Sequence, residues 1–256
     1  MPEPSCSPVV EFRQYKLHPG QRDVLIDLFD REFIESQEAL GMRVIGQFRD
    51  TNDPDRFVWL RGFRDMATRA RGLKGFYGGP VWQEHREVAN ATMIDSSNVL
   101  LLRPARPTSG FSLGGDDRLP RGTNEARSGP VIASIYSLNT SAESAFVDYF
   151  ESKFKPAITD AGAVVLAYFV TEKSANNFPA LPVREGENVF IWFAGFADRT
   201  TDERVLSDDE DFGRSMADAP GLNRPPQVLR LAPTSRSLLS GASRACSAMP
   251  PSGSRP

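Results

Sequence analysis

The chain of 256 residues has a formal net charge of −3, and its 40% hydrophobic and 25% charged residues are typical of a globular protein. This balance gives no reason to expect a nucleic acid or a membrane as partner, and no apolar run is long enough to span a bilayer. The two cysteines, Cys6 and Cys246, form no evident disulfide framework, and the N-terminus lacks signal-peptide features. We therefore expect a cytoplasmic protein.

The first part of the chain alternates between strand and helix patterns. Strands are indicated by period-two alternation, and helices by apolar residues at three- and four-residue steps. Asp65 is placed to cap the second helix, and Pro80 restarts it after Gly78 and Gly79. The expected order is strand, helix, strand, strand, helix, strand, over residues 10–17, 21–40, 42–49, 57–63, 65–93 and 98–103.

A segment rich in glycine, serine and proline separates this unit from a second one with the same order. The expected elements of the second unit are strands at 131–138, 164–171, 188–196 and 227–231 and helices at 139–161 and 198–216. Phe57–Phe63 aligns with Phe190–Phe196, and Val99–Pro104 aligns with Val228–Pro233. The chain is therefore an internal duplication with a period of the size of a small domain.

The duplication predicts the domain organisation. We expect a disordered N-terminus, a first domain, a linker, a second domain and a disordered tail, over residues 1–8, 9–104, 105–130, 131–233 and 234–256. A four-stranded antiparallel sheet with two helices on one face leaves its other face uncovered. Two such units can cover each other, as an intramolecular pseudo-dimer or in a homo-oligomer.

The first unit resembles the NIPSNAP family. The matching stretches are Glu11–Tyr15, Leu40–Met42, Gly46–Phe48, Trp59–Phe63 and Pro80–Trp82. The resemblance implies an α+β fold of two ferredoxin-like βαββαβ repeats in a dimeric α/β-barrel arrangement. The family has no agreed catalytic signature. Relatives of this fold include cofactor-free monooxygenases, polyketide cyclases, muconolactone isomerases and haem-dependent dehydratases, so the fold alone does not choose a function.

The alternation of the first strand separates two faces. We expect Val10 and Phe12 to face the helices, and Glu11, Arg13 and Tyr15 to line the open face of the sheet inside the barrel. The same rule places Tyr168 and Trp192 on the opposite, apolar wall. Buried charges call for a partner, so the cavity is expected to hold an anionic or polar small molecule. The alternative is that Glu11 pairs with neighbouring arginines, or that these charges lie at a solvent-exposed barrel mouth.

These considerations give the candidate site. The proposed catalytic residues are Tyr15, Glu11 and His85, which would move a proton. The proposed substrate-binding residues are Arg13, Trp59, Arg61, Arg103, Tyr168, Trp192 and Arg184. Trp59 and Trp192 are also explained by core packing.

His85 lies one helical turn after Trp82 and has two interpretations. It is the one histidine placed to act as a base or as a proximal haem ligand, although a surface or half-buried helix position explains it more simply. No spacing of ligand residues indicates a metal site. We therefore expect no cofactor, with haem left open.

The second repeat has a long loop at 172–187 that its counterpart lacks. It is expected either to cover the barrel mouth as a lid, with Arg184 or Glu185 pointing inward, or to form an oligomer contact or surface arm. The sequence as a whole favours a protein of small-molecule metabolism, with cofactor-independent isomerisation, cyclisation, elimination or oxygenation as its chemistry. The alternative is a non-catalytic binding or scaffolding protein that acts through the barrel and this loop.

Overall fold

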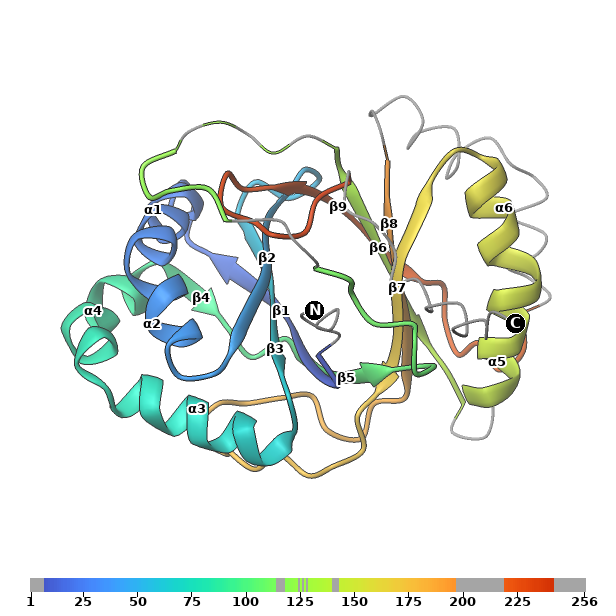
Figure 1. The fold of residues 1–256 in the computed structure, drawn as a ribbon, viewed down its shortest axis with the longest axis horizontal. Helices are drawn as coiled ribbons and strands as arrows, with labels where there is room; N and C mark the ends of the chain where they lie inside the picture. Colours follow the sequence, from blue (N-terminus) through green and yellow to red (C-terminus); the bar gives the residue numbers. More distant parts are fainter. Residues whose placement is uncertain are drawn as a thin grey trace, which may run out of the picture.

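The computed structural model describes residues 7–113, 118–123, 125, 127, 129–139, 143–196 and 219–241. In Figure 1 a β-barrel occupies the middle of the molecule, with α1 to α4 on one side and α5 and α6 on the other. The first half contains β1 Val9–Leu17, α1 Arg22–Leu28, η1 Phe29–Phe33, α2 Ile34–Glu38, β2 Arg43–Asp50, β3 Arg56–Phe63, α3 Met66–Gly78, α4 Pro80–Ala91, β4 Met93–Asp95 and β5 Val99–Pro104. The second half contains β6 Val131–Ser137, α5 Glu143–Tyr149, η2 Phe150–Phe154, α6 Lys155–Asp160, β7 Val164–Thr171, β8 Val189–Gly195 and β9 Gln227–Pro233.

The two halves close one barrel within a single chain. The strands follow the order β3-β2-β9-β6-β8-β7-β5-β1, and β1 pairs with β3 to complete the ring. The pairs are antiparallel, and β4 adds a short edge to β1. The halves meet at two seams, β2 with β9 and β5 with β7. The fold is α+β, an eight-stranded intramolecular pseudo-dimer of the dimeric α/β-barrel type, as the sequence predicts.

Local sequence signals account for most element boundaries. The Asp65 carboxylate caps α3 by accepting the Thr68 amide at 2.6 Å. Gly41, with φ of +79°, ends the first helix in the left-handed conformation. The helix expected over 21–40 is present but contains a π-helical turn, η1, and η2 repeats it in the second half. The helix expected at 198–216 lies outside the described residues.

The barrel interior is filled with apolar side chains. One buried cluster joins both halves, and its members include Val10, Phe12, Leu60, Ile191 and Phe193. An eight-stranded barrel is just wide enough for its inward side chains to fill it. The predicted ligand cavity inside the barrel is therefore absent from the described part of the chain.

The predicted orientation of the first strand was wrong. Val10 and Phe12 point into the barrel, whereas Tyr15 and Trp59 pack with the apolar residues of the covering helices. Both alternates of this strand are almost completely buried, so hydrophobicity alone could not say which one faces the helices. In the second half Tyr168 likewise packs beneath the helices rather than inside the barrel.

β-Bulges also break the expected alternation of side chains along β2 and β7. The register of β2 shifts between Val44 and Gly46, and that of β7 shifts between Val165 and Ala167. Each bulge inserts one extra residue and reverses the alternation beyond it. A strict period of two therefore fails along these two strands.

Two segments expected to be irregular are part of the packed structure. Within the predicted linker, Phe111 enters the barrel core, where its ring centroid lies 5.0 Å from those of Phe169 and Phe193. Within the predicted tail, Leu239 is buried in the same core, and its amide donates to the Ile45 carbonyl at 3.0 Å. The expectation of disorder was therefore wrong for 234–241. The remaining tail residues and residues 1–6 lie outside the described part.

Candidate functional site

Four charged side chains meet between the sheet and the helices of the first half, and all four are fully buried. The Glu11 carboxylate accepts from Arg13 Nη1 at 2.8 Å, from Arg61 Nη2 at 2.6 Å and Nε at 3.2 Å, and from Arg69 Nε at 2.7 Å. Arg69 comes from α3, so this charged cluster ties a helix to the sheet. One carboxylate facing three guanidiniums leaves a formal excess of two positive charges. Such an excess in a buried site favours an anionic or acceptor-rich guest.

Arg61 and Arg13 differ in the donors that they have available. Arg61 directs Nε and Nη2 to Glu11 and Nη1 to Gln37 Oε1 at 2.7 Å. Arg13 directs Nη1 to Glu11 and Nε to the Tyr15 hydroxyl at 3.0 Å, and its Nη2 has no hydrogen-bond partner among the described residues. Arg13 can therefore offer a donor to a guest, whereas Arg61 holds Glu11 in place.

Trp59 lies between these two guanidiniums. Its ring centroid is 5.4 Å from Arg13 Cζ and 5.0 Å from Arg61 Cζ, within the range of cation–π attraction. Its indole nitrogen is buried and, within the described residues, has no acceptor. A buried donor without a partner costs about 1–3 kcal/mol. Arg69 Nη2 also lacks a partner among the described residues, and these three donors, on Arg13, Trp59 and Arg69, point to a missing acceptor.

An aromatic cavity borders the charged cluster. Its volume is about 30 Å³, and Tyr15, Trp59 and Gln37 connect it to the charges. The remaining lining residues come from the helices and β4: Leu25, Phe29, Phe33, Phe76, Tyr77, Trp82, Ala89 and Met93. The rings pack edge to face, with centroids 4.8 Å apart for Phe29 and Trp59 and 4.9 Å apart for Tyr77 and Trp82. In this closed arrangement the cavity has room for about one water molecule.

The long loop of the second repeat covers this region from outside, and Figure 1 shows it passing beside α3. Phe178 stacks on Tyr77 with a centroid distance of 5.9 Å, and Asn177 Nδ2 donates to the Met66 carbonyl at 2.6 Å. Arg69 Nη1 donates to the side-chain oxygens of Asn176 at 3.0 Å and of Asn177 at 2.8 Å. The loop thus contacts both the charged cluster and the aromatic wall, and these contacts come from the second half.

The ionisation of the site residues follows from burial and from these neighbours. Burial acts to raise the pKa of Glu11, but Arg61, Arg13 and Arg69 outweigh it and hold the pKa well below its usual range. Burial raises the pKa of Tyr15, against the opposing effect of Arg13. At neutral pH Glu11 is a carboxylate and Tyr15 is a neutral phenol. This makes Tyr15 a hydrogen-bond donor and Glu11 a counter-ion rather than a proton carrier.

The structure separates the other predicted site residues from this cluster. Arg103 pairs with Glu143 at 2.6 Å, and Arg184 bonds to Glu187 at the end of its own loop and to Asn98, which precedes β5 in the first half. Neither reaches into the aromatic cavity. Arg184 and Glu185 therefore do not point inward as a lid residue would.

The predicted aromatic residues of the second half form a core of their own. The Tyr168 hydroxyl donates to Glu151 Oε1 at 2.6 Å, and Trp192 Nε1 donates to the Tyr136 hydroxyl at 3.0 Å. Both lie beneath α5 and α6, in a different cluster from Tyr15 and Trp59. The structure does not place Tyr168 and Trp192 opposite Arg13.

His85 lies outside the cavity lining. Its Nε2 is 3.7 Å from Glu32 Oε2, and its ring centroid is 6.4 Å from that of Phe33. The haem alternative stays a prediction, since His85 does not line the aromatic cavity and its imidazole lies beside Glu32. Within the described residues, no group of three acidic, histidine or cysteine side chains could hold a metal ion.

Gln37 and Arg69 belong to the site but were not predicted. Gln37 continues the buried stripe of Phe29 and Phe33 at steps of four, and Arg69 stands four residues before the buried Leu73. A polar residue on an otherwise apolar stripe signals a polar partner beneath the helix. That signal was present in the sequence.

Comparisons with known proteins agree with this fold. Residues 10–108 match the model of the NIPSNAP family. A provisionally assigned monooxygenase from Lactobacillus acidophilus NCFM is 11% identical, with 95% of this chain and 98% of that chain covered and a TM-score of 0.54. A second one, from Fusobacterium nucleatum, is 8% identical, with 90% and 93% covered and a TM-score of 0.54.

An anthrone oxidase-like protein is 12% identical, with 91% of this chain and 96% of that chain covered and a TM-score of 0.54. At such identities the similarity shows the fold alone. No curated protein matches the chain. Among the described residues, no helix has the length and apolar character needed to cross a bilayer.

Proposed function

Since residues 10–108 match the model of the NIPSNAP family, we propose that this half binds a small planar organic molecule with an anionic or acceptor oxygen, in the aromatic cavity near Arg13. The observation that supports this most is the pair of unpartnered buried donors, Arg13 Nη2 and Trp59 Nε1, beside a wall of aromatic rings. A phenolate, enolate or carboxylate oxygen would accept from both, and the rings would stack on the ligand. The site is thus beneath the helices and not within the barrel.

The closed cavity must widen before such a ligand is admitted. Trp82 and Tyr77 are half-buried members of its wall, and Phe178 of the covering loop stacks on Tyr77. Movement of these outer rings would open the cavity without disturbing the charged cluster beneath. The hydrogen bonds from Arg69 to Asn176 and Asn177 of the loop would then differ between the open and the closed cavity.

The chemistry that this geometry favours is stabilisation of an oxyanion. Arg13 Cζ lies 5.4 Å from the ring centroids of both Tyr15 and Trp59, so a substrate oxygen that reached these neighbours would be stabilised as an anion and the substrate would ionise more readily. No protein base is required if the substrate proton is acidic enough to pass to water. A carbanion or enolate of this kind can react with molecular oxygen, as in the four-electron conversion of anthrone and O₂ to anthraquinone and water.

A non-catalytic binding function remains the second candidate, and one observation favours it. Glu11 is held ionised by its arginines, and His85 lies outside the cavity, so no group of suitable pKa faces the cavity among the described residues. In that case the site would sequester or sense its ligand.

Fluorescence titration with 1-naphthol and 1-naphthoic acid tests the proposal, because Trp59 and Trp82 line the cavity. We expect quenching in the wild type, and an affinity reduced about tenfold or more by Arg13→Lys and by Tyr15→Phe. Tyr168→Phe, in the second half, is the matched control and should bind normally. Absence of binding by both probes would overturn the proposal.

Oxygen uptake with anthrone then distinguishes the two candidates. Consumption of O₂ that exceeds the uncatalysed rate and falls in Tyr15→Phe supports an oxygenase. Binding of the aromatic probes without any rate enhancement supports the sequestering function.

A further inference from the structure

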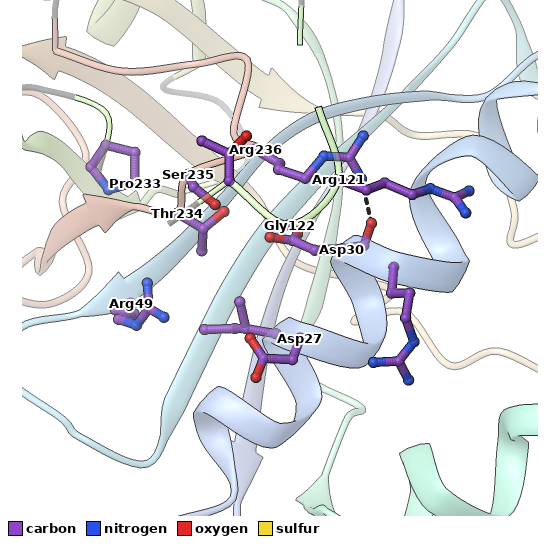
Figure 2. A pocket seen from close by; sticks show the side chains of 12 residues that line it. Asp27, Asp30, Arg49, Arg121, Gly122, Pro233, Thr234, Ser235 and Arg236 are labelled. Carbon is purple, nitrogen blue, oxygen red and sulfur yellow. Dashed lines mark hydrogen bonds between the residues drawn. The ribbon is translucent and has the colours of Figure 1, made fainter. Parts of the chain in front are cut away.

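A second and larger hollow lies on the other face of the first helix. Its volume is about 630 Å³, and it forms where α1 and η1 meet residues 121–123 and the segment 233–236 that follows β9 (Figure 2). The helix directs Leu25, Phe29 and Phe33 toward the aromatic cavity, but presents Asp27 and Asp30 to this pocket. The two hollows are therefore separate, and nothing in the proposed aromatic site uses this one.

Four arginines line this pocket, and each is bonded to a carboxylate outside its lining. Arg31 pairs with Glu32, Arg49 with Asp23, and Arg121 with Glu35. Arg236 also pairs with Glu35. The guanidiniums thus already have counter-ions, although each keeps further N–H groups with which it can bind a ligand.

The two carboxylates of the pocket lack such compensation. Asp27 forms no hydrogen bond or ion pair with any described residue. Asp30 accepts one hydrogen bond, from Gln47 Nε2 to Oδ1 at 3.1 Å, whereas Arg236 bonds to its backbone carbonyl instead of its carboxylate. Figure 2 shows both aspartates on the helix side of the pocket, with Thr234 across from them. The helix side of the pocket, its floor, therefore presents two carboxylates to which no described cation bonds directly.

Buried polar atoms give an independent sign of a missing partner. The Thr234 side chain lines the pocket and is 1% exposed, yet its hydroxyl has no partner within the described residues. Gln47 is fully buried behind Asp30, and its Oε1 likewise lacks a donor. Buried polar atoms are nearly always satisfied in native proteins. A hydrogen-bond donor that enters the pocket would satisfy both the hydroxyl and the acidic floor.

We propose that this pocket binds an amino-acid-like zwitterion, with its ammonium group on Asp30, Asp27 and the Thr234 hydroxyl and its carboxylate on the guanidinium of Arg49. An ammonium group has three donors, which match the three acceptors on the floor. An arginine fork matches a carboxylate, and Figure 2 shows Arg49 on the same side of the pocket as Thr234 and Asp27.

The environment of Asp30 is consistent with this assignment. Burial raises its pKa to about 6, with Asp27 adding to the effect and Arg236, Arg118 and Arg49 opposing it. A carboxylate that is costly to ionise in the empty pocket gains most from a cationic ligand.

Isothermal titration calorimetry of the full-length protein tests the proposal. Free amino acids and glycylglycine are added at up to about 10 mM, so that dissociation constants in the millimolar range are still detected. We expect at least one of them to bind, and its N-acetylated form, which lacks the ammonium group, to bind at least about tenfold more weakly. Asp30→Asn and Thr234→Val should each weaken binding by about tenfold. Asp30→Asn keeps the oxygen that accepts from Gln47, so the fold is expected to survive.

Two control variants test whether the amino acid binds in this pocket and not elsewhere. Asp160→Asn changes an exposed carboxylate of the second half, and Tyr15→Phe changes the aromatic site. Both should bind the amino acid as the wild type does, whatever the fate of the aromatic site. Failure of every amino acid to bind, equal binding of the N-acetylated form, or unchanged binding by Asp30→Asn would each overturn the assignment.

Discussion

Replacing Glu11 by Gln tests how far the first half depends on its buried charges. The variant keeps the size of the side chain but removes the negative charge that Arg13, Arg61 and Arg69 share. Breaking a buried ion pair by removing one partner costs about 3–5 kcal/mol, because the remaining charge is buried without compensation. With a urea m-value of about 3 kcal/mol per M for a chain of this size, the midpoint should fall by about 1–1.7 M.

Urea denaturation at pH 7, followed by tryptophan fluorescence and circular dichroism together, provides the measurement. Asp23→Asn is the control, because its ion pair with Arg49 is 66% exposed on the aspartate side and should contribute less than about 1 kcal/mol. A loss for Glu11→Gln no larger than that of the control would refute the reasoning. It would mean that water or helix movement compensates the arginines.

The same variant has a defined pH dependence. The folded-state pKa of Glu11 lies well below the ordinary value of 4.5, so its stabilisation is fully present above about pH 4.5 and is lost as the pH falls toward the folded-state pKa. The difference in unfolding free energy between wild type and variant should therefore shrink below pH 4.5. A difference that stays constant down to pH 3 would contradict the assignment of the effect to the ionised carboxylate.

Three further predictions concern other parts of the molecule. Phe111→Ala should destabilise the protein by about 3–5 kcal/mol in thermal unfolding because it empties part of the barrel core, whereas Leu40→Ala at an exposed position should change little. Tyr168→Phe should cost about 1 kcal/mol in urea denaturation through the lost bond to Glu151, and a larger effect on naphthol binding than on stability would contradict the placement of the site. Asp30 has an ordinary pKa of 3.8 that is raised to about 6 in the folded protein, so it favours folding at low pH and loses this contribution as the pH rises through 6. Asp30→Asn should therefore be more stable than wild type at pH 8, by on the order of 2 kcal/mol, and equally stable at pH 4. Equal stability of variant and wild type at both pH values would contradict the raised pKa of Asp30.

The repeated order of elements and the closed pseudo-dimer could be predicted from the sequence, because both depend on local patterns. Alternation, the Asp65 cap and the glycine after the first helix are each written into a few neighbouring residues. The aligned tryptophan strands around Trp59 and Trp192 identified the duplication, and the structure places both on equivalent strands, β3 and β8.

The orientation of the sheet could not be predicted in the same way. Alternation separates Phe12 from Arg13, but it does not say which of two buried layers each one enters. The layer is determined by the polar partners of the charged residues, which here are Gln37 and Arg69 on the covering helices. These two polar residues were the clue that the sequence offered. The β-bulges at Val44 and Val165, and the entry of Phe111 into the core, depend on tertiary contacts that no local pattern encodes.

Closing the barrel within one chain has a consequence for how the protein could diversify. In a barrel made from two identical subunits, every change beneath the helices appears twice, so a costly charged cluster would be present in both copies. Here the position of Trp59 among arginines corresponds to that of Trp192 among Tyr136 and Phe150 in a layer of aromatic and aliphatic side chains. The second half can thus serve as a stable support, and supplies the loop that covers its neighbour, while the first half bears the energetic cost of the buried charged cluster.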